Sequence, residues 1–144
     1  MKHLFYLLMF ITSCNTMHKS KTSGTDNSDS KYKNDYRYAD GSGNVYEFSK
    51  KNFEYFPVKP EQSSTGHYSG GEYVKLIPRA VDIEKLIDLI HLAKADTADH
   101  LQNRDKGTGQ ITFKNENGVQ SFILYMQSPH KKSIEEALIN IKNQ

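Results

Sequence analysis

The sequence predicts a small α+β domain in which a mostly antiparallel sheet, made of two hairpins, is packed by two helices. Two stretches alternate apolar and polar side chains around a turn signal, as β-hairpins do. Two others repeat apolar side chains every three to four residues, as amphipathic helices do. Strands come first, followed by a helix, a hairpin and a closing helix, an order typical of α+β layers. The 144 residues have room for one such domain beside a polar tail.

The first hairpin is predicted from the stretch VYEFSKKNFEYFPV, residues 45–58, with Lys50 and Lys51 as a two-residue turn. This turn places four aromatic side chains on one face in two facing pairs, Tyr46 with Tyr55 and Phe48 with Phe53. The same register sets Glu47 against Glu54, which is unfavourable because like charges repel. We therefore expect one aromatic face on this hairpin and one face with an opposed pair of glutamates.

The second hairpin is predicted from QITFKNENGVQSFILYM, residues 110–126. Its Asn117-Gly118 pair is favoured at the centre of a type I′ turn, and this turn determines the register. Counting outward gives two facing apolar pairs, Phe113 with Phe122 and Ile111 with Leu124. These four side chains share one face of the hairpin. The polar side chains of Thr112, Lys114, Glu116 and Ser121 share the other.

Two amphipathic helices are predicted to cover the sheet. The apolar positions of the first are Ile83, Leu86, Ile87, Ile90 and Ala93. In the closing helix, Ser133 and Glu136 have the spacing of a capping box, which predicts the helix start at Ser133. Its apolar stripe then consists of Ile134, Ala137, Leu138 and Ile141.

The N-terminus has the pattern of an export signal. Residues 4–11, LFYLLMFI, form an apolar run that is too short to span a bilayer as a helix. The single cysteine, Cys14, follows in the string ITSC. This string resembles the lipobox of bacterial lipoproteins. The resemblance implies that the chain is cut just before Cys14 and acylated on the cysteine sulfur and the new amino group, which would anchor it in a membrane.

The predicted organisation has three parts: a lipoprotein signal peptide at 1–13, a disordered tether at 14–35 and the α+β domain at 36–144. The tether is rich in Ser, Thr, Asn, Asp and Lys, so it cannot bury enough apolar surface to offset its chain entropy. Asn15 stands where the lipoprotein resemblance implies an aspartate for inner-membrane retention. We therefore expect a lipid-anchored protein of the cell envelope, on the outer membrane and facing the periplasm.

The string SSTGHYSGGEY, residues 63–73, lies between the first hairpin and the first helix and suggests two kinds of chemistry. Two of its glycines have the separation of a P-loop, but Glu72 stands where a lysine must reach the phosphates. A hydrolase elbow at Ser69 would need a glycine at the position of His67. Neither motif is complete.

Two interpretations of this string remain. In the first, its glycines permit positive φ in a turn that leads into a strand, EYVKLI at 72–77. In the second, Tyr68 is a protruding recognition element, because an exposed aromatic ring brings contact area at low entropic cost. The candidate binding residues are His67, Tyr68, Ser69, Gly70 and Gly71.

Candidate metal ligands are incomplete in the sequence. Asp96 and His100 are four residues apart, but no third ligand follows from the spacing. A second pattern copies the first half of a calcium loop but lacks the glycine and glutamate that must follow, and it consists of Asp40, Ser42 and Asn44. We predict no metal and no cofactor. The net charge of +2 and the scattered basic residues also argue against a nucleic-acid partner.

The string YSGGE, Tyr68 to Glu72, precedes a predicted strand, a leucine-rich helix, a hairpin and a final helix. This arrangement resembles the emfourins, small bacterial protein inhibitors of thermolysin-like metallopeptidases. Ser69, Gly70 and Gly71 match the Ser-Gly-Gly signature of that family, whereas its Phe-Ala-Gly is replaced from Glu72 onward. The resemblance implies a protein-binding inhibitor.

These observations predict a membrane-anchored lipoprotein with a small non-enzymatic protein-binding domain, of the inhibitor or immunity type. The expected partner is another envelope protein such as a peptidase or a toxin. No catalytic residue is predicted, since each catalytic motif is incomplete. The alternative is a periplasmic enzyme whose site joins residues distant in sequence, such as His67, His91 and His130.

Overall fold

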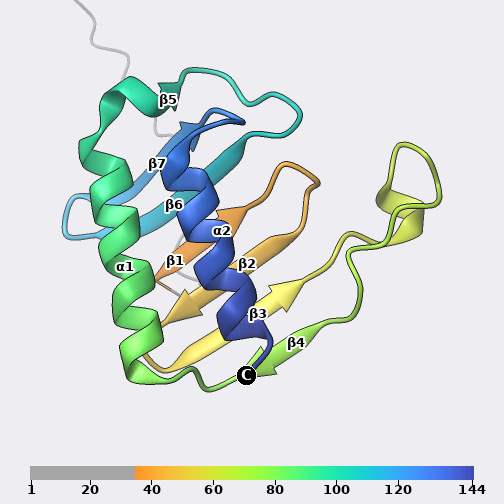
Figure 1. Ribbon diagram of the computed structural model, residues 1–144, viewed down its shortest axis with the longest axis horizontal. Helices are drawn as coiled ribbons and strands as arrows, with labels where there is room; N and C mark the ends of the chain where they lie inside the picture. Colours follow the sequence, from red (N-terminus) through yellow and green to blue (C-terminus); the bar gives the residue numbers. More distant parts are fainter. Residues whose placement is uncertain (1–34) are drawn as a thin grey trace, which may run out of the picture.

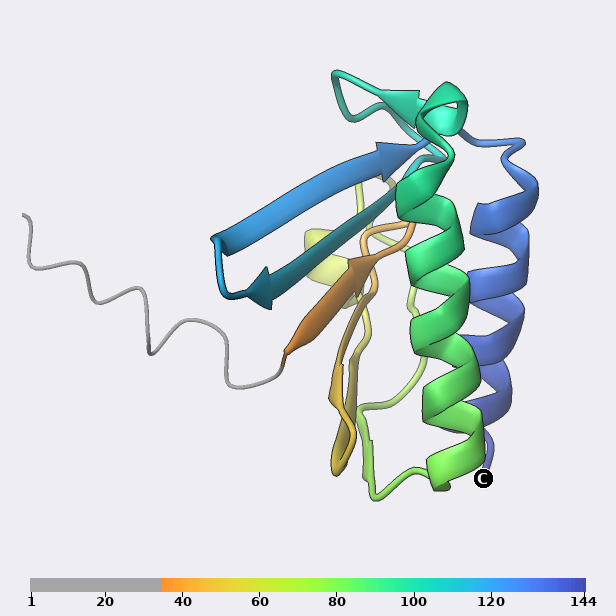
Figure 2. The ribbon, with the colours of Figure 1, turned by 90° about the vertical axis from the view of Figure 1, so that its left-hand side faces the viewer.

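The computed structural model describes residues 35–144, and these form the predicted α+β fold (Figure 1). A seven-stranded antiparallel sheet packs against two helices, and both helices lie on the same side of the sheet (Figure 2). The predicted signal peptide, Cys14 and the tether up to residue 34 lie outside the described residues. Within the described residues, neither helix combines the length and the apolar composition needed to cross a bilayer.

The sheet has the strand order β4-β3-β2-β1-β6-β7-β5. Its strands are β1 (Tyr36–Ala39), β2 (Val45–Ser49), β3 (Asn52–Phe56), β4 (Val74–Leu76), β5 (His100–Leu101), β6 (Gly109–Asn115) and β7 (Gly118–Leu124). The helices are α1 (Ala80–Ala95) and α2 (Pro129–Lys142), with short 3-10 turns η2 (Pro60–Gln62) and η3 (Thr97–Asp99). The first strand within residues 35–144, β1, thus lies in the middle of the sheet, between the two hairpins.

The first hairpin has the predicted register, with Tyr46 opposite Tyr55 and Phe48 opposite Phe53. The predicted opposition of Glu47 and Glu54 also occurs. Each glutamate has a cation of its own. Arg37 Nε lies 3.7 Å from Glu47 Oε1, and Lys75 Nζ lies 3.3 Å from Glu54 Oε1. Neighbouring strands therefore compensate the repulsion within the hairpin.

The predicted register of the second hairpin is wrong by two residues. The facing pairs are Gly109 with Leu124, Ile111 with Phe122 and Phe113 with Gln120. The turn is centred one residue earlier, on Glu116 and Asn117, because a type I′ turn needs positive φ at Asn117. Among the described residues only glycines adopt positive φ, and Gly118 does so at 100°. Since the shift is even, the predicted faces are unchanged.

The core lies between the aromatic face of the sheet and the helices. Buried apolar side chains of α1 are Ile83, Leu86, Ile90 and Ala93, and those of α2 are Ile134, Leu138 and Ile141. Ile87, which was predicted in the same stripe, is only partly buried. On the sheet side, Tyr38, Phe48 and Phe53 are completely buried.

The N-cap of the closing helix lies five residues earlier than predicted. Ser128 is the N-cap residue, and its Oγ accepts a hydrogen bond from the Lys131 backbone N at 3.2 Å. Pro129 occupies the first turn, where a missing N–H costs nothing. Ser133 lies inside the helix and donates from Oγ to the Pro129 carbonyl. The capping box predicted at Ser133 and Glu136 is therefore wrong.

Candidate functional site

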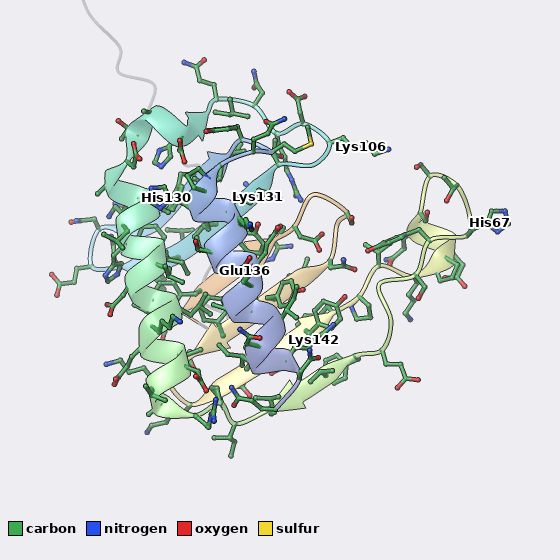
Figure 3. All side chains as sticks on the ribbon, viewed as in Figure 1. His67, Lys106, His130, Lys131, Glu136 and Lys142 are labelled. Atoms are coloured by element: carbon green, nitrogen blue, oxygen red, sulfur yellow. The ribbon has the colours of Figure 1, made fainter. Side chains whose placement is uncertain are left out.

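The predicted binding residues all lie on a loop, residues 57–73, that connects β3 to β4 and extends away from the sheet (Figure 1). We call it the projecting loop. His67 lies at its outer end, far from the helices (Figure 3). Residues 64–69 are all exposed. Of the predicted binding residues, His67, Tyr68 and Ser69 therefore lie in the exposed part of the loop, whereas Gly70 is partly buried.

A single buried amide holds the first half of this loop. Asn44, which is 5% exposed, follows the turn between β1 and β2. Its Oδ1 accepts a hydrogen bond from the Val58 backbone N at 2.9 Å. Its Nδ2 donates to Asp40 Oδ2 at 2.7 Å and to the Tyr68 hydroxyl at 3.0 Å. The Asn44 side chain therefore joins three segments of the chain, and the Tyr68 ring is oriented through its hydroxyl.

Gly70 is packed directly against this amide. Its N donates to the Val58 carbonyl at 2.9 Å, and its carbonyl accepts from the Tyr55 hydroxyl at 2.6 Å. A Cβ at this position would overlap Asn44 Oδ1. Burial, and then the negative charge of Asp40, raises the pKa of Tyr55 to about 12, so its hydroxyl remains a donor at neutral pH.

The glycines of the loop thus serve two different purposes. Gly66 and Gly71 have positive φ, 70° and 97°, as predicted. Gly70 does not, so the prediction of positive φ is wrong for this residue, which is instead required by the close approach of Asn44. Ser69 Oγ accepts a hydrogen bond from the Gly71 backbone N at 3.2 Å and stays within the loop.

The second half of the loop is held at Tyr73. The Tyr73 hydroxyl donates to Glu54 Oε2 at 2.9 Å, and its ring lies 5.3 Å from that of Phe56. Glu54 also accepts a hydrogen bond from Asn52 Nδ2 at 2.8 Å. Hydrogen bonds from Asn52 and Tyr73, together with the Lys75 ammonium, lower the pKa of Glu54. Both ends of the projecting loop are therefore fixed to the sheet.

The tip itself is folded by short-range bonds. The Gly66 backbone N donates to the Ser63 carbonyl at 3.1 Å, and the hydroxyls of Ser63 and Thr65 lie 3.0 Å apart. Tyr68 connects the tip to the base of the loop, because its hydroxyl is bound to Asn44 while the residue is 40% exposed. The tip is therefore an ordered, convex surface made of hydroxyls, an imidazole and an aromatic ring.

A recess of about 500 Å³ lies beside the projecting loop. Its walls include Gln62, Ser64 and Tyr68 on one side and the β1–β2 turn with Lys106 on the other. An adjoining groove of about 640 Å³ continues toward α2, past Met126 and Glu135. The two hollows share the β1–β2 turn and Lys106. They can accept polar or acidic side chains of a molecule that contacts the loop.

The calcium-loop pattern has a purely structural role. Asp40 Oδ1 accepts hydrogen bonds from the backbone N of Ser42 at 2.9 Å and of Asn44 at 2.8 Å. Both bonds close the β1–β2 turn on itself. The carboxylate that would begin a calcium loop thus organises the backbone that supports Asn44.

The structure separates the histidines that an enzyme would need together. His67 lies at the loop tip and His130 at the start of α2, at opposite ends of the molecule (Figure 3). His91 is exposed on α1. A shared site of these three histidines is therefore not formed.

Asp96 and His100, the candidate ligands four residues apart, do not share a site either. His100 Nε2 lies 2.8 Å from the Ala93 carbonyl, and its ring stacks on Phe122 at 4.6 Å. Asp96 instead contacts His130 Nε2 through Oδ2 at 3.2 Å. Sequence reasoning missed this pair because 34 residues separate the two positions and no local spacing relates them.

No protein-family model, no curated protein and no solved structure matches this chain. The geometry of the projecting loop and of its anchoring residues therefore carries the functional proposal.

Proposed function

We propose that this chain is an envelope lipoprotein, acylated at Cys14, whose domain binds another protein through the tip of the projecting loop. The observation that carries the proposal is the bonding of Asn44, which fixes the base of the loop while residues 64–69 remain exposed. A loop ordered in advance loses less conformational entropy on binding. The projecting loop is long, convex and ordered, so it is suited to bind a concave surface on a partner.

The composition of the tip supports a protein as its partner. Tyr68 offers an aromatic face, and the residues around it offer hydroxyls that adapt to different hydrogen-bond partners. The polar recess beside the loop gives room for a partner side chain next to Lys106. The emfourin resemblance of Ser69, Gly70 and Gly71 points to the same class, a peptidase bound by a small inhibitor. A toxin bound by an immunity-type protein fits the same geometry.

The lipid anchor adds to this proposal by mass action. A tethered domain meets partners in the same membrane or the adjacent space at a high effective concentration, so a modest intrinsic affinity is sufficient. The proposed location is the outer membrane, with the domain facing the periplasm. Replacing Cys14 with alanine should move the chain from the membrane fraction to the soluble fraction, and a Cys14→Ala chain that stayed in the membrane would contradict lipidation.

The test of the binding surface uses two substitutions of one residue. Tyr68→Ala removes the ring and the hydroxyl, whereas Tyr68→Phe removes only the hydrogen bond to Asn44. Tagged chains carrying either substitution are crosslinked in the envelope and purified, with His91→Ala on α1 as the surface control. If the ring is a binding anchor, Tyr68→Ala weakens capture by about 1 to 3 kcal/mol. Tyr68→Phe keeps the ring and loses only part of its orientation, so it should weaken capture less, and His91→Ala should recover the same protein as the unmodified chain.

The pattern of results separates recognition from folding. The hydroxyl contributes about 1 kcal/mol to stability, so both Tyr68 variants should melt slightly below the unmodified chain. Only Tyr68→Ala should lose the partner. Equal capture by Tyr68→Ala and the unmodified chain would exclude the tip as the recognition surface.

A further inference from the structure

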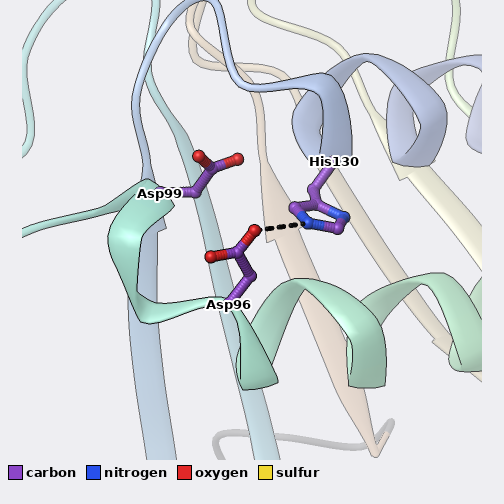
Figure 4. Close-up of side chains that lie close together, drawn as sticks. All are labelled: Asp96, Asp99 and His130. Atoms are coloured by element: carbon purple, nitrogen blue, oxygen red, sulfur yellow. Dashed lines mark hydrogen bonds and ion pairs between the residues drawn. The ribbon is translucent and has the colours of Figure 1, made fainter.

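Three side chains from separate elements converge where α1 ends and α2 begins (Figure 4). Asp96 is the C-cap residue of α1, Asp99 ends η3, and His130 lies in the first turn of α2. One potential ligand atom from each lies within 4.8 Å of the other two. Two carboxylates and one imidazole thus face a common point.

Within residues 35–144, only hydrogen bonds from Ser128 and Tyr125 and the His130 imidazole offset the negative charge at this point. Asp99 is only 9% exposed, and Ser128 Oγ donates to its Oδ2 at 2.6 Å. No lysine or arginine among residues 35–144 forms an ion pair with Asp96 or Asp99. His130 carries charge only when protonated. A buried carboxylate beside a second carboxylate is unfavourable without a cation.

We propose that Asp96, Asp99 and His130 bind a divalent transition-metal ion of the zinc class. Imidazole nitrogen with carboxylate oxygen is a donor set that suits zinc, whereas calcium and magnesium prefer oxygen ligands alone. The two carboxylates supply the charge that matches a divalent ion when His130 is neutral. Three protein ligands leave a fourth position for water on the exposed side, next to Asp96.

The spacing is close to what the ion requires. A tetrahedral zinc with ligands about 2.1 Å away holds them roughly 3.4 Å from one another. His130 Nε2 and Asp96 Oδ2 are already 3.2 Å apart. The largest separation in the cluster, up to 4.8 Å, must contract by about 1.4 Å, and the exposed side chain of Asp96 can supply this movement by rotation.

The surroundings of Asp99 act as the supporting layer of such a site. The Ser128 hydroxyl donates a hydrogen bond to the Asp99 carboxylate and accepts one from the Lys131 backbone N. Asp99, one of the proposed ligands, is therefore fixed to the N-cap of α2. The end of α1 adds partial negative charge and the start of α2 partial positive charge, which oppose each other. The two carboxylates therefore determine the sign of the local charge, which is negative. A bound ion would link two helices that are far apart in the sequence.

The test uses the chain from residue 14 onward, with Cys14→Ala in every variant so that a free thiol cannot bind zinc. After treatment with a chelator and dialysis, zinc chloride is titrated by calorimetry and thermal melting is recorded with zinc, calcium or no metal. We expect one zinc ion per chain and a zinc-dependent rise in melting temperature that calcium does not produce. Asp96→Asn and His130→Ala should each weaken zinc binding by about tenfold or more, while His91→Ala should not.

The controls separate a metal site from a simple ion pair. His91 is an exposed histidine on α1 outside the cluster, so it reports nonspecific zinc binding. Asp96 is exposed and outside the core, so Asp96→Asn tests the site even if His130→Ala unfolds. If zinc failed to bind, or bound His130→Ala and Asp96→Asn as tightly as His91→Ala, the proposal would be overturned. The proposal would also be overturned if Asp96→Asn and His130→Ala lowered the melting temperature by the same amount with zinc as without it.

Discussion

The base of the projecting loop and the junction of α1 with α2 are held in place by different kinds of interaction. The base of the projecting loop is held around the buried Asn44 amide, a neutral side chain that is bonded to Val58, to Tyr68 and to the Asp40 carboxylate. The junction of α1 with α2 is held by charged groups, Asp96, Asp99 and His130, together with Ser128. At the loop base the polar atoms of the Asn44 side chain are paired, whereas the helix junction holds more negative than positive charge.

Because of this difference, the stability of the two regions should respond differently to mutation, to pH and to added ions. A network centred on a neutral amide responds to the loss of a partner but hardly to pH or to added ions, because the amide itself does not ionise. A charged cluster responds to both. The loop base is therefore suited to a permanent shape, and the helix junction to a contact that depends on its surroundings.

The largest effect is expected from Asn44→Ala. This substitution leaves the half-buried Val58 N–H and the Tyr68 hydroxyl without their partner and also removes the bond to Asp40. We expect a loss of about 2 to 3 kcal/mol in the free energy of unfolding, because three bonds are lost together. Urea denaturation followed by circular dichroism measures it. Asn103→Ala, at an exposed position, is the matched control and should change stability little.

The contrast between the regions would fail if the Asn44→Ala loss depended on zinc. We expect the same difference from the unmodified chain in the presence of zinc and of a chelator, since no residue around Asn44 belongs to the charged cluster. A loss that disappeared with zinc would mean that the two ends are coupled.

The next effect concerns Gly70→Ala. The added Cβ overlaps Asn44 Oδ1, so the amide must move, and we expect a loss of about 1 to 2 kcal/mol. A double-mutant cycle sharpens this test. In the Asn44→Ala background the overlapping atom is absent, and Gly70→Ala should then cost clearly less. Additive losses would show that the overlap is not the cause.

The smallest effect is expected at Glu54, the one titrating group at the base of the loop with a lowered pKa. Its pKa in the folded chain lies below the ordinary value of 4.5, so its contribution is fully present above pH 4.5 and is lost as the pH falls through the folded value. Thermal melting between neutral pH and pH 3 measures this loss. Glu54→Gln should lower the melting temperature near pH 7, where the ionised carboxylate stabilises the fold, and should flatten the curve in the acid range, where the melting temperatures of the two chains approach each other. An unchanged acid slope would contradict the assignment.

Local patterns in the sequence were enough to predict the helices, the first hairpin and the faces of both hairpins. The Lys50-Lys51 turn and the aromatic alternation agree, and this agreement determined the register of β2 and β3. In the second hairpin the faces follow from alternation, but the register depends on which residues take positive φ. Because Asn117 does not, the turn moved by one residue.

Other elements have no local signal of their own. β5 contains two residues, His100 and Leu101, and exists because β7 offers an edge at Leu124 and Ile123. β1 has four residues and is a strand because neighbours pair with it on both sides. Such short strands are stabilised by tertiary contacts rather than by propensity.

The candidate sites divide in the same way. The projecting loop was found because glycines and hydroxyls cluster within eleven consecutive positions, 63–73. The role of Asn44 was missed, because its partners Val58 and Tyr68 lie 14 and 24 residues away. The cluster of Asp96, Asp99 and His130 was missed for the same reason, since only the packing of α2 against α1 brings His130 to the carboxylates.

The central position of β1 has a mechanical consequence for a chain that is anchored at its N-terminus. If the chain is anchored through Cys14, as we propose, tension from the anchor would enter the domain at Asp35 and run along β1. Antiparallel ladders flank this strand on both sides, to β2 and to β6. The Tyr36 ring stacks on Phe48 at 5.4 Å and on Phe113 at 6.2 Å at the point where the force arrives. A pull along the strand loads both ladders in shear, so drag on a captured partner would be shared between the two halves of the sheet.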